Sequence, residues 1–328
     1  MTQRSTHRKA ESGLSLVELL VAMTIGLIVI GVGASAFLNV ATNTRNASEL
    51  ARMNENASIA LNILRSHITL AGYSHPTGVV HSTASGTDVA TMVRAFKGGT
   101  KAAGDANNFI VGCDGPFNTP KAHELDISLL SSSSNCKGGA NPDAIAVVYE
   151  ADPNNTYSDG GGVPTDCLGN TILPLLGTTD LFVASNKFYI DKDVNNITGL
   201  YCQGNGSSTA RAAGNDTLDA SAQMIVENIY DMQIKYGVAD ITTTGTSTSP
   251  KKEAIAYLDA ADVNNLSGTD KWNRVVSVRL CVEVRSTSPT VGSDQTKYLD
   301  CNGTVSGKPS GAGLIRTYST TVVLHNRI

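Results

Sequence analysis

Apolar residues dominate the start of the chain from Leu14 to Leu38, and Glu18 is the one charged residue among them. As a helix this segment would be about 36 Å long, enough to cross a hydrocarbon core of about 30 Å. Arg4, Arg8 and Lys9 stand just before it, and basic residues collect on the cytoplasmic side of membrane helices. The pattern therefore predicts a single membrane-spanning helix over residues 14–38, with a cytoplasmic N-terminus.

A second pattern follows, in which apolar residues recur every three or four positions. The stripe consists of Leu50, Met53, Ala57, Ala60, Leu61, Leu64 and Ile68. Polar residues fill the positions between them, which is typical of an amphipathic helix. We expect residues 39–72 to continue the membrane helix, to end near Gly72 and to form one wall of a folded domain.

The C-terminal half alternates between apolar and polar residues, which is typical of half-buried strands. Strands are predicted at Val276–Val284 and Tyr230–Tyr236, and further candidates are Ala144–Ala151, Lys187–Ile190 and Thr317–His325. A long helix followed by mostly antiparallel strands and polar loops indicates an α+β fold. Residues 73–328 should form the β-rich globular domain, packed on the amphipathic half of the helix.

Six cysteines follow the membrane segment, and none lies in the first hundred residues. An even number in that position fits disulfides in an oxidising compartment, although partly free, buried thiols are an alternative. Sequence alone allows many pairings, but pairing neighbours in sequence closes the shortest loops. We therefore predict the disulfides Cys113–Cys136, Cys167–Cys202 and Cys281–Cys301. Cys281 falls on the polar face of its strand, so its disulfide would tie a loop across the outside of the sheet.

Glu18 is costly where the pattern puts it, because a carboxylate at the centre of a bilayer costs about 2.5–3.5 kcal/mol even on a lenient scale. Such an acid is a functional candidate and needs a partner. Cleavage between Gly13 and Leu14 would free an α-amine, and the amine of a neighbouring subunit is a natural partner. The alternative is that Glu18 lies at the wet interface and is merely solvated.

Gly13 followed by LSLVELLVAMTIGLIVIG resembles the class III signal of type IV pilins and pseudopilins. The resemblance implies that a prepilin peptidase removes the basic leader 1–13 and that the Leu14 amine is methylated. It also implies that the helix packs in a filament core, with Glu18 as the assembly residue. Four further stretches resemble PilW-type minor pilins, namely Ala57–His75 with its AGY turn, Ile225–Val238, Asn273–Ser286 and the closing VVLHNRI. No resemblance covers the region from about Ser82 to Gln223.

The resemblance implies a structural role. The chain would be a minor pilin that helps start and prime type IV pilus assembly by docking with other minor pilins and the major pilin. Its further partners would be membrane lipid before assembly and an inner-membrane assembly platform. It would sit in the bacterial inner membrane with its globular domain in the periplasm, and later in the pilus at the cell surface. No cofactor is expected, and a separate cytosolic ATPase would power the filament.

Two alternatives to this role stay open. One is a J-type pseudopilin of a type II secretion system, which shares the signal and the architecture. The other is a pilus-tip adhesin or ligand-binding module that would use the region from about 82 to 223, since long loop-rich insertions can carry binding functions. Genome neighbourhood would distinguish a pseudopilin from a minor pilin. Loss of surface binding when the region from about 82 to 223 is deleted, with piliation intact, would favour the adhesin.

Candidate chemistry elsewhere in the chain is weak. Asp191 and Asp193 resemble the start of a calcium loop, but that loop needs Gly at its sixth position and an acid at its twelfth, where the chain has Asn196 and Cys202. The similar stretches at Asp193 and Asp262 are expected to be two similar turns with local backbone caps. The sequence contains no nucleophile–base motif of the kind that would indicate an enzyme. A net charge of −4 gives no case for nucleic acid as the main partner.

Overall fold

The computed structural model describes residues 15–82, 89–94, 108–118, 136–139, 142–174, 180–206, 222–241, 253–268, 271–287, 297–307 and 313–326. The predicted leader 1–13 and the cleavage residues Gly13 and Leu14 lie outside the described residues. So does part of the region from 82 to 223.

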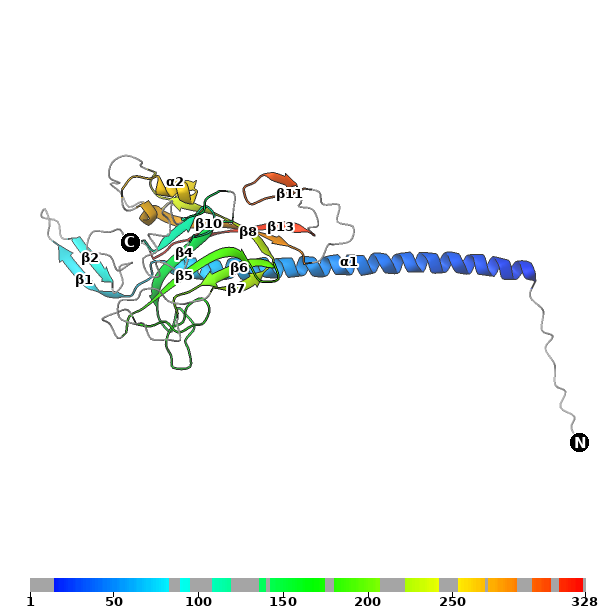
Figure 1. Ribbon diagram of the computed structural model, residues 1–328, viewed down its shortest axis with the longest axis horizontal. Helices are drawn as coiled ribbons and strands as arrows, with labels where there is room; N and C mark the ends of the chain where they lie inside the picture. Colours follow the sequence, from blue (N-terminus) through cyan, green and yellow to red (C-terminus); the bar gives the residue numbers. More distant parts are fainter. Residues whose placement is uncertain are drawn as a thin grey trace, which may run out of the picture. The chain divides into compact units, whose positions relative to one another are not determined.

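A single helix, α1 (Leu16–Leu70), runs through both hydrophobic patterns without a break (Figure 1). The chain divides into two compact units, residues 1–49 and residues 50–328, and α1 contributes to both. An 18-residue window of α1 has a mean hydropathy of 2.4, and none of that window is buried. By length and composition, α1 is the one helix in the described part of the chain that could cross a membrane.

The buried side chains of α1 all fall in its second half. They are Met53, Ala57, Ala60, Leu64 and Ile68, which is the predicted stripe without the partly buried Leu50 and Leu61. The helix ends at Leu70, and Gly72 follows with a φ of +75°. An amphipathic helix that ends near Gly72 is therefore confirmed.

One sheet has five antiparallel strands in the order β3-β4-β5-β6-β7. The strands are β3 (Ile110–Cys113), β4 (Ala144–Ala151), β5 (Phe182–Lys192), β6 (Thr198–Gln203) and β7 (Gln223–Glu227). The bounds of β4 match the predicted strand, and every residue of β4 is buried. β5 contains the predicted Lys187–Ile190 and extends beyond it at both ends.

A second sheet has four strands in the order β13-β10-β8-β9. They are β8 (Ile229–Val238), β9 (Ala256–Leu258), β10 (Val275–Arg285) and β13 (Ile315–Val323). Two separate hairpins pair β1 (Pro76–Ser82) with β2 (Val89–Arg94), and β11 (Lys297–Leu299) with β12 (Val305–Gly307). A short helix α2 (Ala260–Asn264) and a 3-10 helix (Lys271–Arg274) precede β10.

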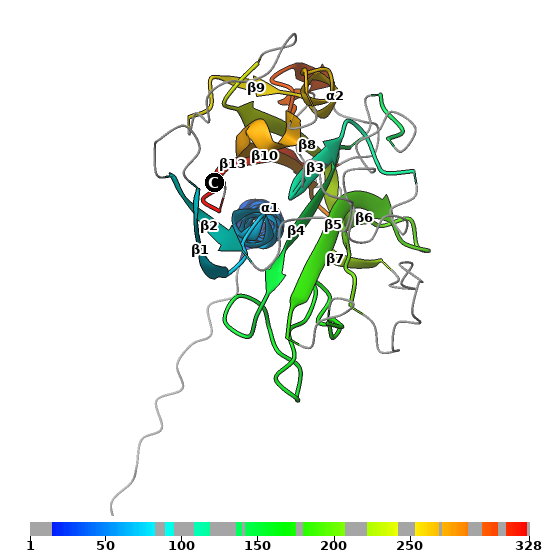
Figure 2. The ribbon, with the colours of Figure 1, turned by 90° about the vertical axis from the view of Figure 1, so that its left-hand side faces the viewer.

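The second half of α1 packs against both sheets. In Figure 2, which looks along the helix, the two sheets lie on adjacent sides of it. Asn56 Nδ2 donates a hydrogen bond to the carbonyl of Glu227 in β7 (3.2 Å), while Tyr318 Oη of β13 donates to Asn54 Oδ1 (2.5 Å). A long helix packed on antiparallel sheets confirms the predicted α+β class.

The stretch Ile225–Val238 switches between the two sheets, which its apolar pattern does not show. Asn228 has a φ of 63°, and β7 ends just before it while β8 begins just after it. β7 pairs with β6, whereas β8 pairs with β10. Strict alternation would bury Tyr230, but the buried residue is Ile229, and the ring of Tyr230 lies under the Arg285 guanidinium (3.7 Å to the ring centroid).

β10 keeps the predicted alternation only from Val278 onward. The register with β8 shifts between Val275 and Ser277, so that Val275 is buried and Val276 is only partly buried. Glu283, predicted on the polar face, is 4% exposed. It is covered because Cys301, in the turn between β11 and β12, donates its N–H to Glu283 Oε1 (3.2 Å).

Candidate functional site

The first turn of α1 holds Glu18, the residue predicted to join subunits. Val17 N–H donates to Ser15 Oγ (3.4 Å), and Ser15 N–H donates to Glu18 Oε2 (3.2 Å). The carboxylate therefore accepts one backbone hydrogen bond within its own chain, and its role in joining subunits stays a prediction. Gly13 and Leu14 lie outside the described residues, and their cleavage and methylation stay predictions.

The apolar side chains after Glu18 are exposed in the chain by itself; Leu27 is 70% exposed and Phe37 is 72% exposed. At Gly26, Gly31 and Gly33, an added Cβ would meet nothing within 4 Å. Contiguous apolar surface of this size is not left open to water in soluble proteins. The segment therefore requires an apolar environment, either lipid or other helices.

At the other end of α1 the chain joins the five-stranded sheet directly. Gly72 N–H donates to the carbonyl of Val148 (3.0 Å), and Glu150 N–H donates to the carbonyl of Tyr73 (2.8 Å). Gly72 suits this turn because its φ is positive and a Cβ there would lie 3.1 Å from the ring of Phe109. The AGY turn named in the resemblance is thus the point where the helix docks on β4.

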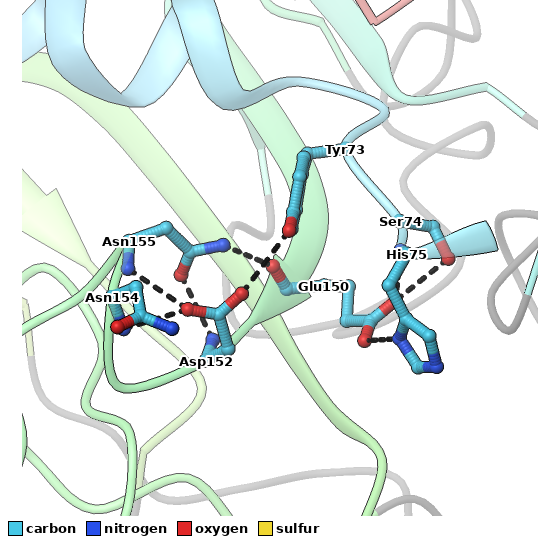
Figure 3. A network of polar contacts seen from close by, with 7 residues as sticks. All are labelled: Tyr73, Ser74, His75, Glu150, Asp152, Asn154 and Asn155. Carbon is cyan, nitrogen blue, oxygen red and sulfur yellow. Dashed lines mark hydrogen bonds and ion pairs between the residues drawn. The ribbon is translucent and has the colours of Figure 1, made fainter.

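Two side chains that follow this turn converge on the carboxylate of Glu150 (Figure 3). Ser74 Oγ donates to Oε2 (2.7 Å), His75 N–H donates to the same oxygen (2.9 Å), and His75 Nδ1 contacts Oε1. Glu150 is only 5% exposed, and a buried carboxylate needs such partners. These bonds hold the chain after the helix against the end of β4.

Asp152 organises the turn after β4 in the same region (Figure 3). Its Oδ1 accepts the N–H groups of Asn154 (2.7 Å) and Asn155 (3.0 Å), and its own N–H donates to Asn155 Oδ1 (2.8 Å). Tyr73 Oη donates to Asp152 Oδ2 (3.3 Å). Burial, followed by the charge and the hydrogen bond of Asp152, raises the pKa of Tyr73. The helix exit and the turn after β4 therefore hold each other.

A second polar cluster lies between α1 and the sheet. His67 Nδ1 is 2.9 Å from Tyr149 Oη, and Asn186 Nδ2 donates to the same hydroxyl (3.1 Å). Cys167 N–H donates to Asn186 Oδ1 (3.1 Å). Burial lowers the pKa of His67 to about 4 and raises the pKa of Tyr149. His67 is therefore neutral at neutral pH, and the cluster carries no charge there.

Asp143 connects the two sheets. Its N–H donates to the carbonyl of Met232 (2.7 Å), its Oδ2 accepts the N–H of Ile234 (2.8 Å), and its Oδ1 accepts the N–H of Gly115 (3.2 Å). Asp143 directly precedes β4, whereas Met232 and Ile234 belong to β8. Burial raises the pKa of Asp143 to about 7, although the two N–H groups act in the opposite direction.

The structure contains the disulfides Cys113–Cys136, Cys167–Cys202 and Cys281–Cys301, and no cysteine is free. These are the pairs that the shortest-loop argument predicts. The last ties the outer side of β10 to the turn between β11 and β12, as the polar position of Cys281 suggests.

Turns of one kind recur in the globular unit, and only the turn at Asp193 was predicted from the sequence. They begin at Asp159, Asp166, Asp193 and Asp300. In each, the carboxylate accepts the N–H groups two and four residues further on, at 2.7–3.0 Å. The residue three positions on has positive φ and is Gly162, Gly169, Asn196 or Gly303. The signal was visible as Asp followed three residues later by Gly or Asn, and Cys167 and Cys301 carry disulfides within two of these turns.

The weak calcium candidate belongs to one of these turns. Asp193 Oδ1 accepts its own turn's N–H groups, and Oδ2 accepts Asn195 Nδ2 (3.3 Å), while Asp191 Oδ1 accepts the N–H of Lys192 (2.8 Å). Among the described residues, no group of three or more His, Cys, Asp or Glu is placed to hold a metal ion. The stretch at Asp262 lies in α2, so the expectation of two similar turns is wrong.

Two family models match parts of the chain. The prokaryotic N-terminal methylation motif matches residues 8–34, and the model of the type IV pilus-assembly protein W family matches residues 187–326. No curated protein matches the chain. A solved type IV-like pilin from Thermus thermophilus is similar at 11% identity, over 84% of this chain and 99% of that chain, with a TM-score of 0.32.

The family match covers β6 to β13, including the sheet switch at Asn228, the central strand β10 and the hairpin held by Cys281–Cys301. The methylation motif covers Ser15, which directly precedes α1, and the first turns of α1 with Glu18. The chain is therefore similar to the type IV pilus-assembly protein W family over residues 187–326 and carries the prokaryotic N-terminal methylation motif at residues 8–34.

Proposed function

We propose that this pilus-assembly protein, a structural pilin and not an enzyme, acts as a minor pilin that helps start and prime the filament. It would do so by docking with other minor pilins and the major pilin. The observation that carries the proposal is the division of α1. Its first half is apolar and exposed and has Glu18 in its first turn, while its second half packs in the core of the globular unit.

The exposed half of α1 would exchange lipid for the helices of neighbouring subunits. This exchange gives no hydrophobic gain, because lipid tails are as apolar as leucine. Stability must come from close helix packing and from polar pairs. Gly26, Gly31 and Gly33 offer positions for close approach, and Glu18 offers the acid, with the α-amine at Leu14 of a neighbour as its proposed partner.

The globular unit would present its surfaces to partner domains in the periplasm. Its three disulfides fit an oxidising compartment, and the inner-membrane anchor is α1 before assembly. The bonds of Glu150 and Asp152 at the helix exit fix the end of α1 on β4, so the unit would keep its attachment while the apolar half changes partners. The family matched is one of pilus assembly, which favours the pilus over the secretion pseudopilus.

Two substitutions test the proposal. Changing Gly13 should block removal of the leader, and mature-length protein on a gel would contradict the signal. Glu18→Ala should be cleaved normally yet fail to join filaments or to co-purify with other pilins from detergent-solubilised inner membranes.

Glu55→Ala is the matched control, because Glu55 is an exposed acid on the same helix outside the apolar half. It should leave both cleavage and co-purification unchanged. Normal recovery of partners with the Glu18 variant would defeat the role proposed for this acid.

A further inference from the structure

The start of α1 reads Ser15-Leu16-Val17-Glu18, which has the spacing of a capping box. In a capping box the serine hydroxyl accepts the N–H of the third helical residue, and the acid at that third position accepts the serine's own N–H. The second of these bonds is present, from Ser15 N–H to Glu18 Oε2 (3.2 Å). The hydroxyl of Ser15 instead accepts the N–H of the second helical residue, Val17 (3.4 Å), as N-cap side chains also do. The acid proposed to join subunits therefore also caps the N-terminus of its own helix.

We propose that Ser15 is a positioning residue for Glu18. By holding Oε2, it turns the carboxylate back toward the start of the helix and leaves Oε1 to accept a bond from the α-amine of a neighbouring pilin. This inference rests on the proposed function. Across the residues that the structure describes, no group donates a hydrogen bond to Oε1.

The capping box lowers the entropy lost when subunits pair. A free glutamate side chain samples many rotamers, and pairing removes that freedom. A carboxylate already held by Ser15 has lost most of it before the neighbour arrives, which is the advantage of preorganisation. The box and the intersubunit pair can coexist, because the two oxygens of a carboxylate together accept several hydrogen bonds.

The capping box also gives Glu18 a partner while the subunit is alone in the membrane. An unpartnered carboxylate is costly in apolar surroundings, and the N–H of Ser15 reduces that cost. Assembly would then add a second bond to an acid that is already held. The bond from Ser15 would thus hold Glu18 both in the monomer inserted in the membrane and in the assembled filament.

Three substitutions at Ser15 separate the two bonds. Ser15→Ala removes Oγ and keeps the N–H, Ser15→Pro removes the N–H at a position where helices tolerate proline, and Ser15→Thr keeps both groups. Ser35→Ala is the matched control, because Ser35 lies in the same apolar segment and its hydroxyl only donates to the carbonyl of Val32 (2.8 Å). Each variant is made in the full chain with Glu18 intact and again with Glu18→Ala.

The readouts are mature length on gels and co-purification of other pilins from solubilised membranes. With Glu18 present, Ser15→Pro removes the N–H that holds Oε2 and should lower co-purification about tenfold, the size of a lost hydrogen bond to a charged group. Ser15→Ala keeps that N–H and removes only the Oγ that accepts the N–H of Val17, so its drop should be smaller. The Thr variant and the Ser35 control should match wild type. With Glu18→Ala, the Ser15 variants should have no further effect, because residues that act as one unit are not additive.

Wild-type recovery of the Pro variant would overturn the inference, and so would an equal drop of that variant in the two backgrounds. If the Pro variant is not cleaved, the contrast between the Ala and Thr variants decides the question by itself. The proposed function fails separately, when Glu18→Ala alone co-purifies normally.

Discussion

Two buried tyrosines, Tyr149 and Tyr236, differ in what their hydroxyl groups meet, and removing those hydroxyls should change stability in opposite directions. Tyr149 is 0% exposed and Tyr236 is 1% exposed. The Tyr149 hydroxyl contacts His67 Nδ1 (2.9 Å) and Asn186 Nδ2 (3.1 Å). Within the part of the chain that the structure describes, the buried Tyr236 hydroxyl has no hydrogen-bond partner. The two sites thus form a matched pair for one substitution, Tyr to Phe.

The expected magnitudes follow from these contacts. Tyr149→Phe removes the common partner of His67 and the buried Asn186 amide, but Asn186 Nδ2 still contacts His67 Nδ1 (3.3 Å). The free energy of unfolding should therefore fall by about 1 kcal/mol, the size of a typical lost hydrogen bond. Tyr236→Phe removes a hydroxyl whose burial without a partner costs about 1–3 kcal/mol, and keeps the edge-on contact of its ring with Trp272 (4.9 Å between centroids). The free energy of unfolding should therefore rise by about 1 kcal/mol or more.

Urea unfolding of the full chain in detergent micelles, at neutral pH with the disulfides intact, measures both effects. Trp272 is the single tryptophan of the chain and reports on the core by fluorescence. Because it touches Tyr236, far-UV circular dichroism is followed in parallel. The urea dependence must stay constant for the midpoints to report stability. Equal losses for both variants would show that the Tyr236 hydroxyl has a stabilising partner, and would refute the argument.

Opposite slopes of stability with pH should come from His67, whose pKa is lowered from 6.5 to about 4, and Asp143, whose pKa is raised from 3.8 to about 7. As pH falls from 6.5 to 4, His67 should lower the free energy of unfolding by about 3 kcal/mol, whereas Asp143 should raise it by about 4 kcal/mol as pH falls from 7 to 3.8. In urea titrations at decreasing pH, His67→Gln should therefore gain stability relative to wild type, and Asp143→Asn should lose it. Gly72→Ala should lower the melting temperature by the equivalent of about 1–2 kcal/mol, because its φ is positive, whereas Gly78→Ala, where a Cβ meets nothing within 4 Å, should be far milder. Asp300→Ala should speed amide hydrogen exchange at the N–H groups two and four residues on, which its carboxylate holds; unchanged protection there would contradict the turn's role.

Local sequence patterns predicted those elements whose buried residues follow a regular spacing or an uninterrupted apolar run. The stripe of α1 repeats every three or four residues, so its buried face could be read directly, from Met53 to Ile68. β4 is an uninterrupted run, and its bounds agree with prediction. The disulfides followed from loop length, since each joins neighbours in sequence.

Long-range pairing explains what the patterns missed. The apolar character of Ile225–Val238 continues across Asn228, and only the partners β6 and β10 reveal that two sheets meet there. The alternation of β10 predicts that Glu283 faces solvent, because the sequence of one strand does not indicate that a distant hairpin will cover it. The bonds of Glu150 to Ser74 and His75 join residues about seventy-five positions apart in sequence, and no local signal predicts them. The capping box at Ser15 and the turns that begin at Asp had local signals.

The division of α1 has a consequence for how such a subunit can change environment. Every buried side chain of the helix lies at or after Met53, and the polar bonds at the helix exit involve residues from Tyr73 onward. The buried side chains that α1 gives to the core of the globular unit therefore begin at Met53. If the apolar half exchanges lipid for neighbouring helices, as we propose, these buried side chains keep their place. The free energy of assembly would then depend on helix packing and on Glu18, whereas the stability of the globular unit would depend on its sheets and disulfides.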